Sequence, residues 1–271
     1  MSSLPKGTIS LTFGDQGENH AGMQIIGSPA ERGFNLEDLT RASNYFTERG
    51  FQTEIIPVHE KLPAEIYSSV PAGLVDAYLL VVKNGVSAFV SPDYLYLEQY
   101  NLKMDKKALM RGRVVNKIAR WNLCYDDVGQ EADYDSGKGT IVPFSTVPLI
   151  SGVREQLAGL FGIPRPIAEM NFYYDVNKCG IGYHGDTERK IVMCCRLGES
   201  MTLSYQWHIG PERVGEQIRL MLEHGDLYVM SEKAVGYDWK KSVVDVGVGG
   251  KSKKVPLPTL RHAAGCAKYV D

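Results

Sequence analysis

Residues 171–188 read NFYYDVNKCGIGYHGDTE, and this segment places an imidazole and a carboxylate two residues apart on an aromatic, strand-like run. Side chains at positions i and i+2 of a strand share a face, so His184 and Asp186 can bind the same ion. A His-x-Asp pair supplies two of the three ligands in the two-histidine, one-carboxylate site typical of non-haem Fe(II). The segment therefore predicts oxidative chemistry at a metal centre.

The composition indicates a globular protein with a buried core. The chain has 271 residues, 44% of them hydrophobic, enough for one large domain or two modest ones. Its formal net charge of -2 excludes a whole-protein field that attracts nucleic acid or an anionic membrane. Five cysteines without a Cys-x-x-Cys pair indicate reduced thiols. Because no apolar stretch approaches the ~20 residues of a membrane span and no signal-peptide pattern opens the chain, we expect an intracellular protein, cytoplasmic or nuclear.

Residues 1–90 are expected to form a small α/β segment. Strands are predicted at 9–13, 51–58 and 77–83, with a helix that begins after Asn35, a suitable N-cap, and stops at Gly50. Ser91 and Pro92 open a further helix, behind which leucines repeat every seven residues. We therefore expect a helix over residues 91–118 that bridges to the rest of the chain.

From residue 119 onward the sequence changes to short strands and turns. Residues 190–196 and 201–207 flank the turn LGES, and residues 217–222 and 227–230 flank the turn EHGD, so each pair is predicted to form a hairpin. Successive antiparallel pairs favour a sandwich or barrel. The predicted class is α+β, with a β-rich domain over residues 119–271.

Six motifs in this second part follow one another in a familiar order. They are YDSG at 134–137, Asn171-x-Tyr173, His184-x-Asp186-x-Glu188, RLG at 196–198, GDLYVM at 225–230 and TLRH at 259–262. Residues 119–268 thereby resemble the AlkB family of Fe(II)- and 2-oxoglutarate-dependent dioxygenases, which share a double-stranded β-helix (jelly-roll) core. Each motif alone is weak, but six in register are specific. The resemblance implies a jelly-roll core over residues 119–271.

The resemblance also implies roles for individual residues. His184 and Asp186 would hold Fe(II), and Asn171 and Tyr173 would hydrogen-bond 2-oxoglutarate. Arg261 would pair with a carboxylate of this co-substrate, as suits a planar guanidinium. The family's reaction consumes dioxygen and 2-oxoglutarate, releases succinate and carbon dioxide, and hydroxylates a C–H bond, often on an N-alkyl group.

The second iron histidine of the family is missing from its expected place. It normally stands in a Trp-x-His-like context after the Gly-Asp strand, and Lys241 occupies that position here. A protonated ammonium cannot ligate a cation. His262 is our choice for the third ligand, with Asp238 as the alternative. On a regular strand Arg261 and His262 point to opposite faces, so both can serve only if a bulge or a strand end intervenes.

A basic run between residues 103 and 120 bears on the substrate. Its seven cations face a single carboxylate, Asp105; they are Lys103, Lys106, Lys107, Arg111, Arg113, Lys117 and Arg120. The run is either a solvated helix face or a strip that faces the phosphates of DNA or RNA. Candidate substrate-binding residues are Arg113 and the motif residues Thr187 and Glu188, which lie where family members contact substrate.

Three aromatic residues that follow this run, Trp121, Tyr125 and Tyr134, either stack on an extruded base or belong to the core. Our leading hypothesis is an Fe(II)- and 2-oxoglutarate-dependent oxygenase that acts on an alkylated or methylated base in nucleic acid. A second keeps this chemistry but assigns a free nucleotide, a small molecule or a protein side chain as substrate. A third is a jelly-roll binding module without catalysis.

Overall fold

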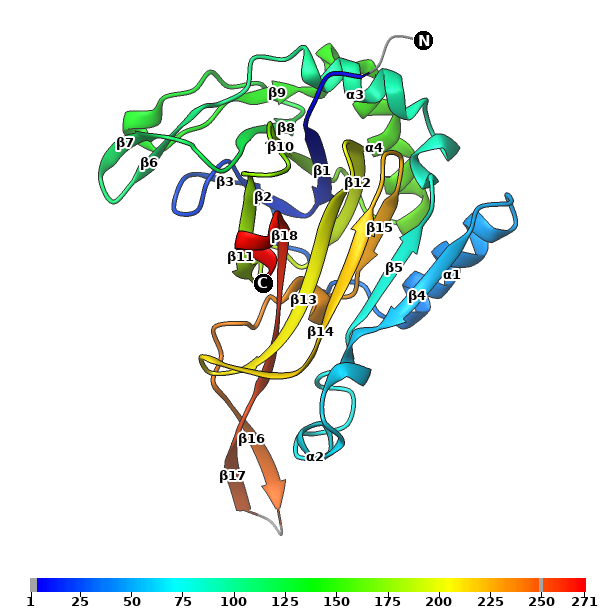
Figure 1. Ribbon diagram of the computed structural model, residues 1–271, viewed down its shortest axis with the longest axis vertical. Coiled ribbons are helices and arrows are strands. Elements are labelled where there is room, and N and C mark those ends of the chain that lie inside the picture. Colours follow the sequence, from blue (N-terminus) through cyan, green and yellow to red (C-terminus); the bar gives the residue numbers. More distant parts are fainter. Residues whose placement is uncertain (1–3, 249–250) are drawn as a thin grey trace.

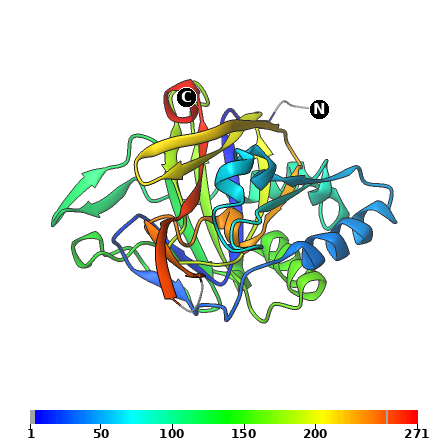
Figure 2. The ribbon, with the colours of Figure 1, turned by 90° about the horizontal axis from the view of Figure 1, so that it is seen from below.

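The computed structural model describes residues 4–248 and 251–271. Two large β-sheets lie against each other, and the longer helices cover one of them from outside (Figures 1 and 2). The α+β class with a β-rich body is thereby confirmed. Within the described ranges, no helix combines the length and apolar character that crossing a membrane requires.

The larger sheet has eight strands in the order β4-β5-β15-β12-β1-β10-β8-β9. Its neighbours are antiparallel except for β8 and β9. The strands are β1 (Thr8–Gly14), β4 (Thr53–Pro57), β5 (Tyr78–Val82), β8 (Trp121–Asp126), β9 (Ile141–Pro143), β10 (Ile167–Tyr173), β12 (Val192–Gly198) and β15 (Leu227–Met230).

The smaller sheet has the order β11-β18-β13-β14. Its strands are β11 (Gly180–His184), β13 (Met201–Ile209), β14 (Glu212–Leu222) and β18 (Pro258–Gly265). Three two-stranded ribbons accompany the sheets: β2 (Gln16–Glu18) with β3 (Ile25–Gly27), β6 (Lys107–Met110) with β7 (Arg113–Asn116), and β16 (Val243–Val248) with β17 (Lys251–Pro256).

Two large hydrophobic clusters form most of the core, one on each face of the larger sheet, and a small third cluster joins Ile26, Cys124, Ile141 and Ile167. The outer cluster packs α1, α3 and α4 against the sheet, and the inner cluster fills the space between the two sheets. The α-helices are α1 (Leu36–Thr47), α2 (Ala64–Tyr67), α3 (Pro92–Tyr100), α4 (Pro148–Phe161), α5 (Glu232–Val235) and α6 (Ala267–Val270). Short 3-10 helices lie at Val58–Lys61, Gly85–Ala88, Tyr134–Ser136 and Phe144–Thr146.

The N-terminal strand β1 lies in the middle of the larger sheet. It pairs on one side with β10 and on the other with β12, although more than 150 residues of chain separate it from either. Strand β5 likewise joins the sheet beside β15. The first 90 residues therefore share one sheet and one core with the C-terminal part, and do not form a body of their own.

Between β10 and β18 the chain passes repeatedly from one sheet to the other. Strands β10, β12 and β15 belong to the larger sheet, whereas β11, β13, β14 and β18 belong to the smaller one. The two predicted hairpins are therefore wrong, because LGES and EHGD connect strands of different sheets. Within this part the adjacent strands that do pair are β13 with β14 and β16 with β17.

The bridging helix is shorter than predicted. It begins at Pro92 as expected but ends at Tyr100, and residues 107–116 form the ribbon β6–β7. The tip of this ribbon is Arg111-Gly112, where both residues have positive φ, a conformation that suits a tight turn and ends a helix. The basic run is therefore not a helix face, because much of it lies on a ribbon that projects from the molecule (Figure 1).

Candidate metal centre

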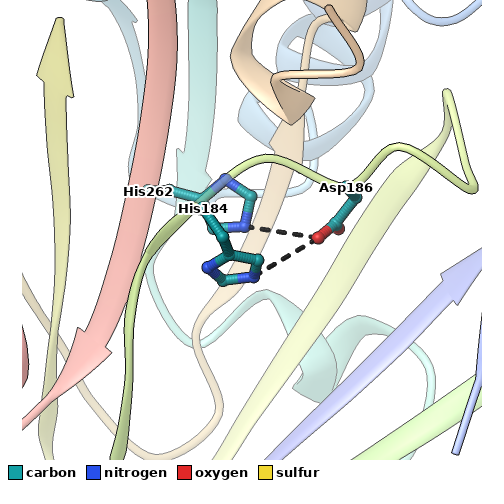
Figure 3. Close-up of side chains that lie close together, drawn as sticks. All are labelled: His184, Asp186 and His262. Atoms are coloured by element: carbon teal, nitrogen blue, oxygen red, sulfur yellow. Dashed lines mark ion pairs between the residues drawn. The ribbon is translucent and has the colours of Figure 1, made fainter. Parts of the chain in front are cut away.

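His184 and His262 lie opposite each other on neighbouring strands of the smaller sheet. His184 ends β11, His262 lies on β18, and the two are register partners next to an irregularity in β11. Asp186 follows two residues after His184. The structure thus brings together His184, Asp186 and His262, with one donor atom of each within 4.8 Å of the others (Figure 3).

The atoms that converge are two imidazole nitrogens and one carboxylate oxygen. The His184 Nε2 atom lies 3.4 Å from Asp186 Oδ1, and His262 Nε2 lies 3.7 Å from the same oxygen. The two imidazole rings have their centroids 4.4 Å apart. All three side chains are at least three-quarters buried, so an ion held between them would be largely shielded from water.

The protonation states suit a cation. Burial, followed by the nearby His184, lowers the pKa of His262 to about 3, so its imidazole is neutral at pH 7. Burial opposes ionisation of Asp186, but Arg189 and both histidines outweigh it and hold the pKa of Asp186 well below its usual value. His184 Nδ1 lies 2.8 Å from the carbonyl oxygen of Gly182, which selects the tautomer whose Nε2 carries a lone pair. The three donors therefore have the chemistry of a divalent metal site.

Gly185 lets the loop between the two motif ligands approach α5 closely. A Cβ atom at this position would lie 2.2 Å from the carbonyl oxygen of Gly236. The amide of Asp186 donates to the carbonyl oxygen of Val235 at 3.1 Å, which fixes the loop against α5. The middle residue of His-Gly-Asp is therefore a glycine for steric reasons.

Arg189 orients Asp186 from behind and was not singled out in the sequence. Its guanidinium is buried and contacts Glu169, Glu188 at 2.9 Å and Asp186 Oδ2 at 3.6 Å. The contact with Oδ2 leaves Oδ1 to face the histidines. Its position three residues after Asp186, a candidate metal ligand, was the available signal.

A cavity of about 70 Å³ adjoins the three candidate ligands. Tyr173 lines it, as do Ser10 and Thr12 of β1. Asn171 points from β10 toward the same inner face, where its side-chain oxygen accepts from Arg120 Nε at 2.6 Å and from Asn122. The predicted co-substrate residues Asn171 and Tyr173 thus lie on the inner face of the larger sheet.

Arg261 points away from this cavity. Strand β18 pairs with β13 in unbroken register from Ala264 to Pro258, so Arg261 and His262 face opposite sides. The Arg261 guanidinium donates to the carbonyl oxygen of Gly210 at 2.7 Å and lies over the Trp239 ring, 5.2 Å from its centroid. The predicted pairing of Arg261 with a carboxylate beside the candidate metal ligands is therefore contradicted, because the irregularity that it required lies in β11 and not in β18.

The alternative third ligand, Asp238, is engaged elsewhere. Lys233 Nζ donates to its carboxylate at 2.7 Å, and Asp238 does not belong to the His184–Asp186–His262 group. Lys241, at the position of the expected histidine, is exposed. Of the two residues that the sequence left open, His262 is the one beside His184 and Asp186.

The three candidate substrate residues do not lie together: Thr187 and Glu188 are close to Asp186, whereas Arg113 is on the β6–β7 ribbon. Thr187 is half-buried after Asp186, the Glu188 carboxylate contacts Arg189, and Arg113 is exposed on β7. Of the basic run, Lys117 Nζ donates to Asn19 and Asn122, and Lys106 lies over the Trp121 ring. The remaining exposed cations are Lys103, Lys107, Arg111 and Arg113.

The three aromatic candidates have partners within the fold. Tyr125 is fully buried, with its hydroxyl against Gln99, so it belongs to the core. The Trp121 ring stacks on Tyr174 with centroids 4.6 Å apart. Tyr134 donates to Asp105 at 2.7 Å. Base stacking by Tyr125 is therefore excluded.

Comparison with known proteins adds one relative of nearly the same length. The chain is 43% identical over 265 residues to "Uncharacterized protein R156" of Acanthamoeba polyphaga mimivirus, an alignment that covers 98% of both proteins. No family model matches the chain.

Proposed function

We infer that this chain, which belongs to the same family as the mimivirus protein R156, is an Fe(II)- and 2-oxoglutarate-dependent oxygenase. The observation that carries this proposal is the convergence of His184, Asp186 and His262 at one point between two sheets. Two imidazoles and one carboxylate leave the remaining positions of a six-coordinate ion free for a keto acid and dioxygen. This donor set distinguishes the site from a structural zinc site, where four protein ligands close the coordination sphere.

The topology supports a jelly-roll of eight strands, seven from the part of the chain after residue 119 and the eighth from β1. From β10 to β18 the chain passes repeatedly from one sheet to the other, and β10, β12 and β15 leave one gap in the larger sheet, between β10 and β12. Strand β1 fills that gap, antiparallel to both neighbours. Eight strands in two facing sheets of four then make up the jelly-roll, with β4, β5, β8 and β9 extending the larger sheet.

The residues around the metal position have distinct roles in the proposed reaction. His184, Asp186 and His262 would hold the ion, and Arg189 orients the Asp186 carboxylate through Oδ2. Bound Fe(II) would couple oxidation of 2-oxoglutarate, to succinate and carbon dioxide, with hydroxylation of a substrate C–H bond by dioxygen. The inner-face side chains exclude bulk water, which protects a reactive centre from side reactions.

For the substrate we propose an alkylated or methylated base in nucleic acid. Lys107, Arg111 and Arg113 are exposed on the β6–β7 ribbon, which projects from the sheets in both views (Figures 1 and 2). Exposed cations on a projecting ribbon suit phosphate contacts, which carry most of the affinity for a nucleic acid. The small net charge favours the alternative, in which the same chemistry acts on a free nucleotide, a small molecule or a protein side chain.

Anaerobic titration with Fe(II) and 2-oxoglutarate tests the proposed chemistry. We expect a metal-to-ligand charge-transfer absorption in the wild type and its loss in His184→Ala, Asp186→Ala and His262→Ala. His208→Ala is the matched control, because His208 is also a buried strand histidine but lies outside the metal group. A folded wild type that shows no such absorption would support a binding module in place of an enzyme.

A further inference from the structure

Arg196 lies on the inner face of the larger sheet and is completely buried. In β12 the residues Met193, Cys195 and Leu197 belong to the outer cluster, whereas Val192 and Cys194 belong to the inner one. By the alternation of a strand, the Arg196 side chain points into the space between the sheets. Its exposed fraction is 0%.

The Arg196 guanidinium is a charge without a partner. Among the described residues, none of its three nitrogen atoms has a hydrogen-bond partner. The backbone carbonyl of Asp226 accepts a hydrogen bond from the backbone amide of Arg196. The Asp226 carboxylate, however, accepts from Lys83 and from the Asn84 amide, and not from the Arg196 guanidinium. A guanidinium stays protonated in proteins, and an unpaired buried charge costs several kcal/mol. An unpaired guanidinium in this position therefore indicates a binding site for an anion, which would pair with the charge.

Arg196 stands in one row with the residues that the resemblance assigns to the co-substrate. Ser10 on β1 is the register partner of Asn171 on one side and of Arg196 on the other. Asn171 and Arg196 are therefore two strands apart, roughly 10 Å across the sheet. Ser10 also lines the cavity that adjoins His184, Asp186 and His262. Through Ser10, this row of residues extends from Arg196 to the cavity beside the three metal-binding candidates.

A second unpartnered donor lies on the opposite wall of the interior. The Tyr205 hydroxyl is buried and has no hydrogen-bond partner among the described residues. Its ring centroid lies 6.0 Å from that of His262. Two unpartnered donors thus face the space between the sheets, one on each sheet, and Tyr205 is the one close to the metal-binding candidates.

We propose that Arg196 binds the distal carboxylate of a small dicarboxylic keto acid whose other end lies at His184, Asp186 and His262. This proposal rests on the proposed function and moves the anchoring role from Arg261, which faces away, to a different strand. The planar guanidinium can donate two parallel hydrogen bonds to one carboxylate. Because the cavity of about 70 Å³ is smaller than such a ligand, binding also requires side chains of the inner face to move.

Calorimetry of the Mn(II)-loaded protein with 2-oxoglutarate and with 2-oxobutyrate tests this assignment without turnover. The two acids share the keto-acid end, and only 2-oxoglutarate has the distal carboxylate. A charge-assisted pair of hydrogen bonds predicts about 10–100-fold tighter binding of 2-oxoglutarate to the wild type. In Arg196→Met this ratio should fall to near one, whereas Arg261→Met, the matched control, should keep it.

The ratio of the affinities for the two acids decides whether Arg196 binds the distal carboxylate. A wild-type ratio near one overturns the proposal, as does a ratio that Arg196→Met leaves unchanged. Because the methionine variant removes an unpaired buried charge, its ligand-free melting temperature should equal or exceed that of the wild type. If the methionine variant does not fold, Arg196→Lys, which keeps the charge but loses the fork, should show an intermediate ratio, and an unaltered ratio there overturns the assignment.

Failure of the metal site gives a different pattern. If Mn(II) does not bind to the wild type, the proposed oxygenase fails, and the two acids are then compared on the metal-free protein. If Arg196 is an anion site, the metal-free protein should still bind 2-oxoglutarate more tightly than 2-oxobutyrate. Equal binding of both acids would overturn the anion site as well. The two proposals are therefore separable.

Discussion

Arg189 is the residue that holds the acidic side chains of the candidate site together. It is buried and contacts Glu169, Glu188 and Asp186, so its loss leaves several carboxylates close to one another without a cation. Removing one partner of a buried ion pair costs about 3–5 kcal/mol. We expect Arg189→Met to lower the free energy of unfolding by about that amount in urea at pH 7.

Arg165→Met provides the control for this loss. Arg165 also binds a carboxylate, that of Asp127, but its side chain is 79% exposed. An exposed ion pair contributes about 0–1 kcal/mol, so the control should change stability little. Equal losses in the two variants would contradict the role of burial in this network.

Asp38 gives the fold a dependence on acidic pH. It accepts from the Asn35 amide at 3.1 Å and from Arg32 at 2.6 Å in the first turn of α1. The hydrogen bond from Arg32 is the main cause that lowers the pKa of Asp38 from its usual 3.8 to about 2. Because the folded pKa lies below the unfolded one, the ionised carboxylate stabilises the fold above about pH 4 and loses this effect toward pH 2.

Asp38→Asn should therefore cost on the order of 1–2 kcal/mol at pH 7. The figure is discounted because Arg32 and Arg41, which both contact the carboxylate, are exposed. The difference from the wild type should shrink as the pH falls from 4 to 2, measured by urea unfolding. Glu37→Gln, an exposed neighbour in the same turn, should change stability by less than about 1 kcal/mol. A loss from Asp38→Asn that does not vary with pH would contradict the assignment.

The sequence carried the local chemistry of the candidate site better than its long-range part. The short spacing of His184 and Asp186 keeps the two side chains close, although Asp186 lies in the loop after β11 and not on the strand. Asn35 is the N-cap as predicted, and Asp38 completes a capping box with it. The role of Arg196 was out of reach because its unpartnered state depends on the burial that three other strands create. The face of Arg261 depended on the register of β18 with β13, which no local pattern contains.

At the scale of elements, turn chemistry was a misleading guide to pairing. The segments before and after LGES are strands as predicted, yet β12 pairs with β1 and β15 while β13 pairs with β14 and β18. A short Gly-containing turn fits a hairpin and a crossing between facing sheets equally well. Local sequence therefore predicts that a strand exists, whereas burial on both faces selects its partner.

The β6–β7 ribbon permits a direct test of nucleic-acid binding. We expect Lys107→Ala/Arg113→Ala to weaken binding to a methylated single-stranded oligonucleotide and to reduce the salt dependence. If both cations contact phosphates, the slope of log K against log salt should fall by about 1.4, the value for two single-strand phosphates. Fluorescence anisotropy at several salt concentrations measures this slope.

The second projecting ribbon supplies the matched control. Lys253 and Lys254 are exposed on β17, so Lys253→Ala/Lys254→Ala removes the same charge from a different place. This variant should keep the wild-type slope. Equal effects of the two double variants would indicate non-specific attraction, and no measurable affinity of the wild type would favour a free nucleotide, a small molecule or a protein side chain as the substrate.

At the scale of the whole molecule, the N-terminal strand completes the sheet that the C-terminal part leaves open. The order β12-β1-β10 cannot be read from local patterns, because β1 looks like an ordinary first strand of an α/β segment. Six motifs in the second part predicted its strands without this partner. The inner face of β1 nevertheless contributes Ser10 and Thr12 to the cavity, so the candidate site draws on both ends of the chain.

This architecture predicts that the fold tolerates a change of connectivity. Strand β1 is held in the sheet by its ladders to β10 and β12, and chain termini that lie at the surface often permit circular permutation. We therefore expect a permutant that starts at Asp15 and carries residues 4–14 behind Asp271 to fold and to bind Mn(II). A Gly/Ser linker of about 15 residues, with a span of roughly 20 Å, would join the old termini.

A chain that only lacks residues 1–14 should fail to fold cooperatively in urea and should lose Mn(II) binding, because two ladders and the wall of the cavity are then missing. Cooperative unfolding and wild-type metal affinity in that truncated chain would show that β1 is dispensable and would contradict its place as the closing strand.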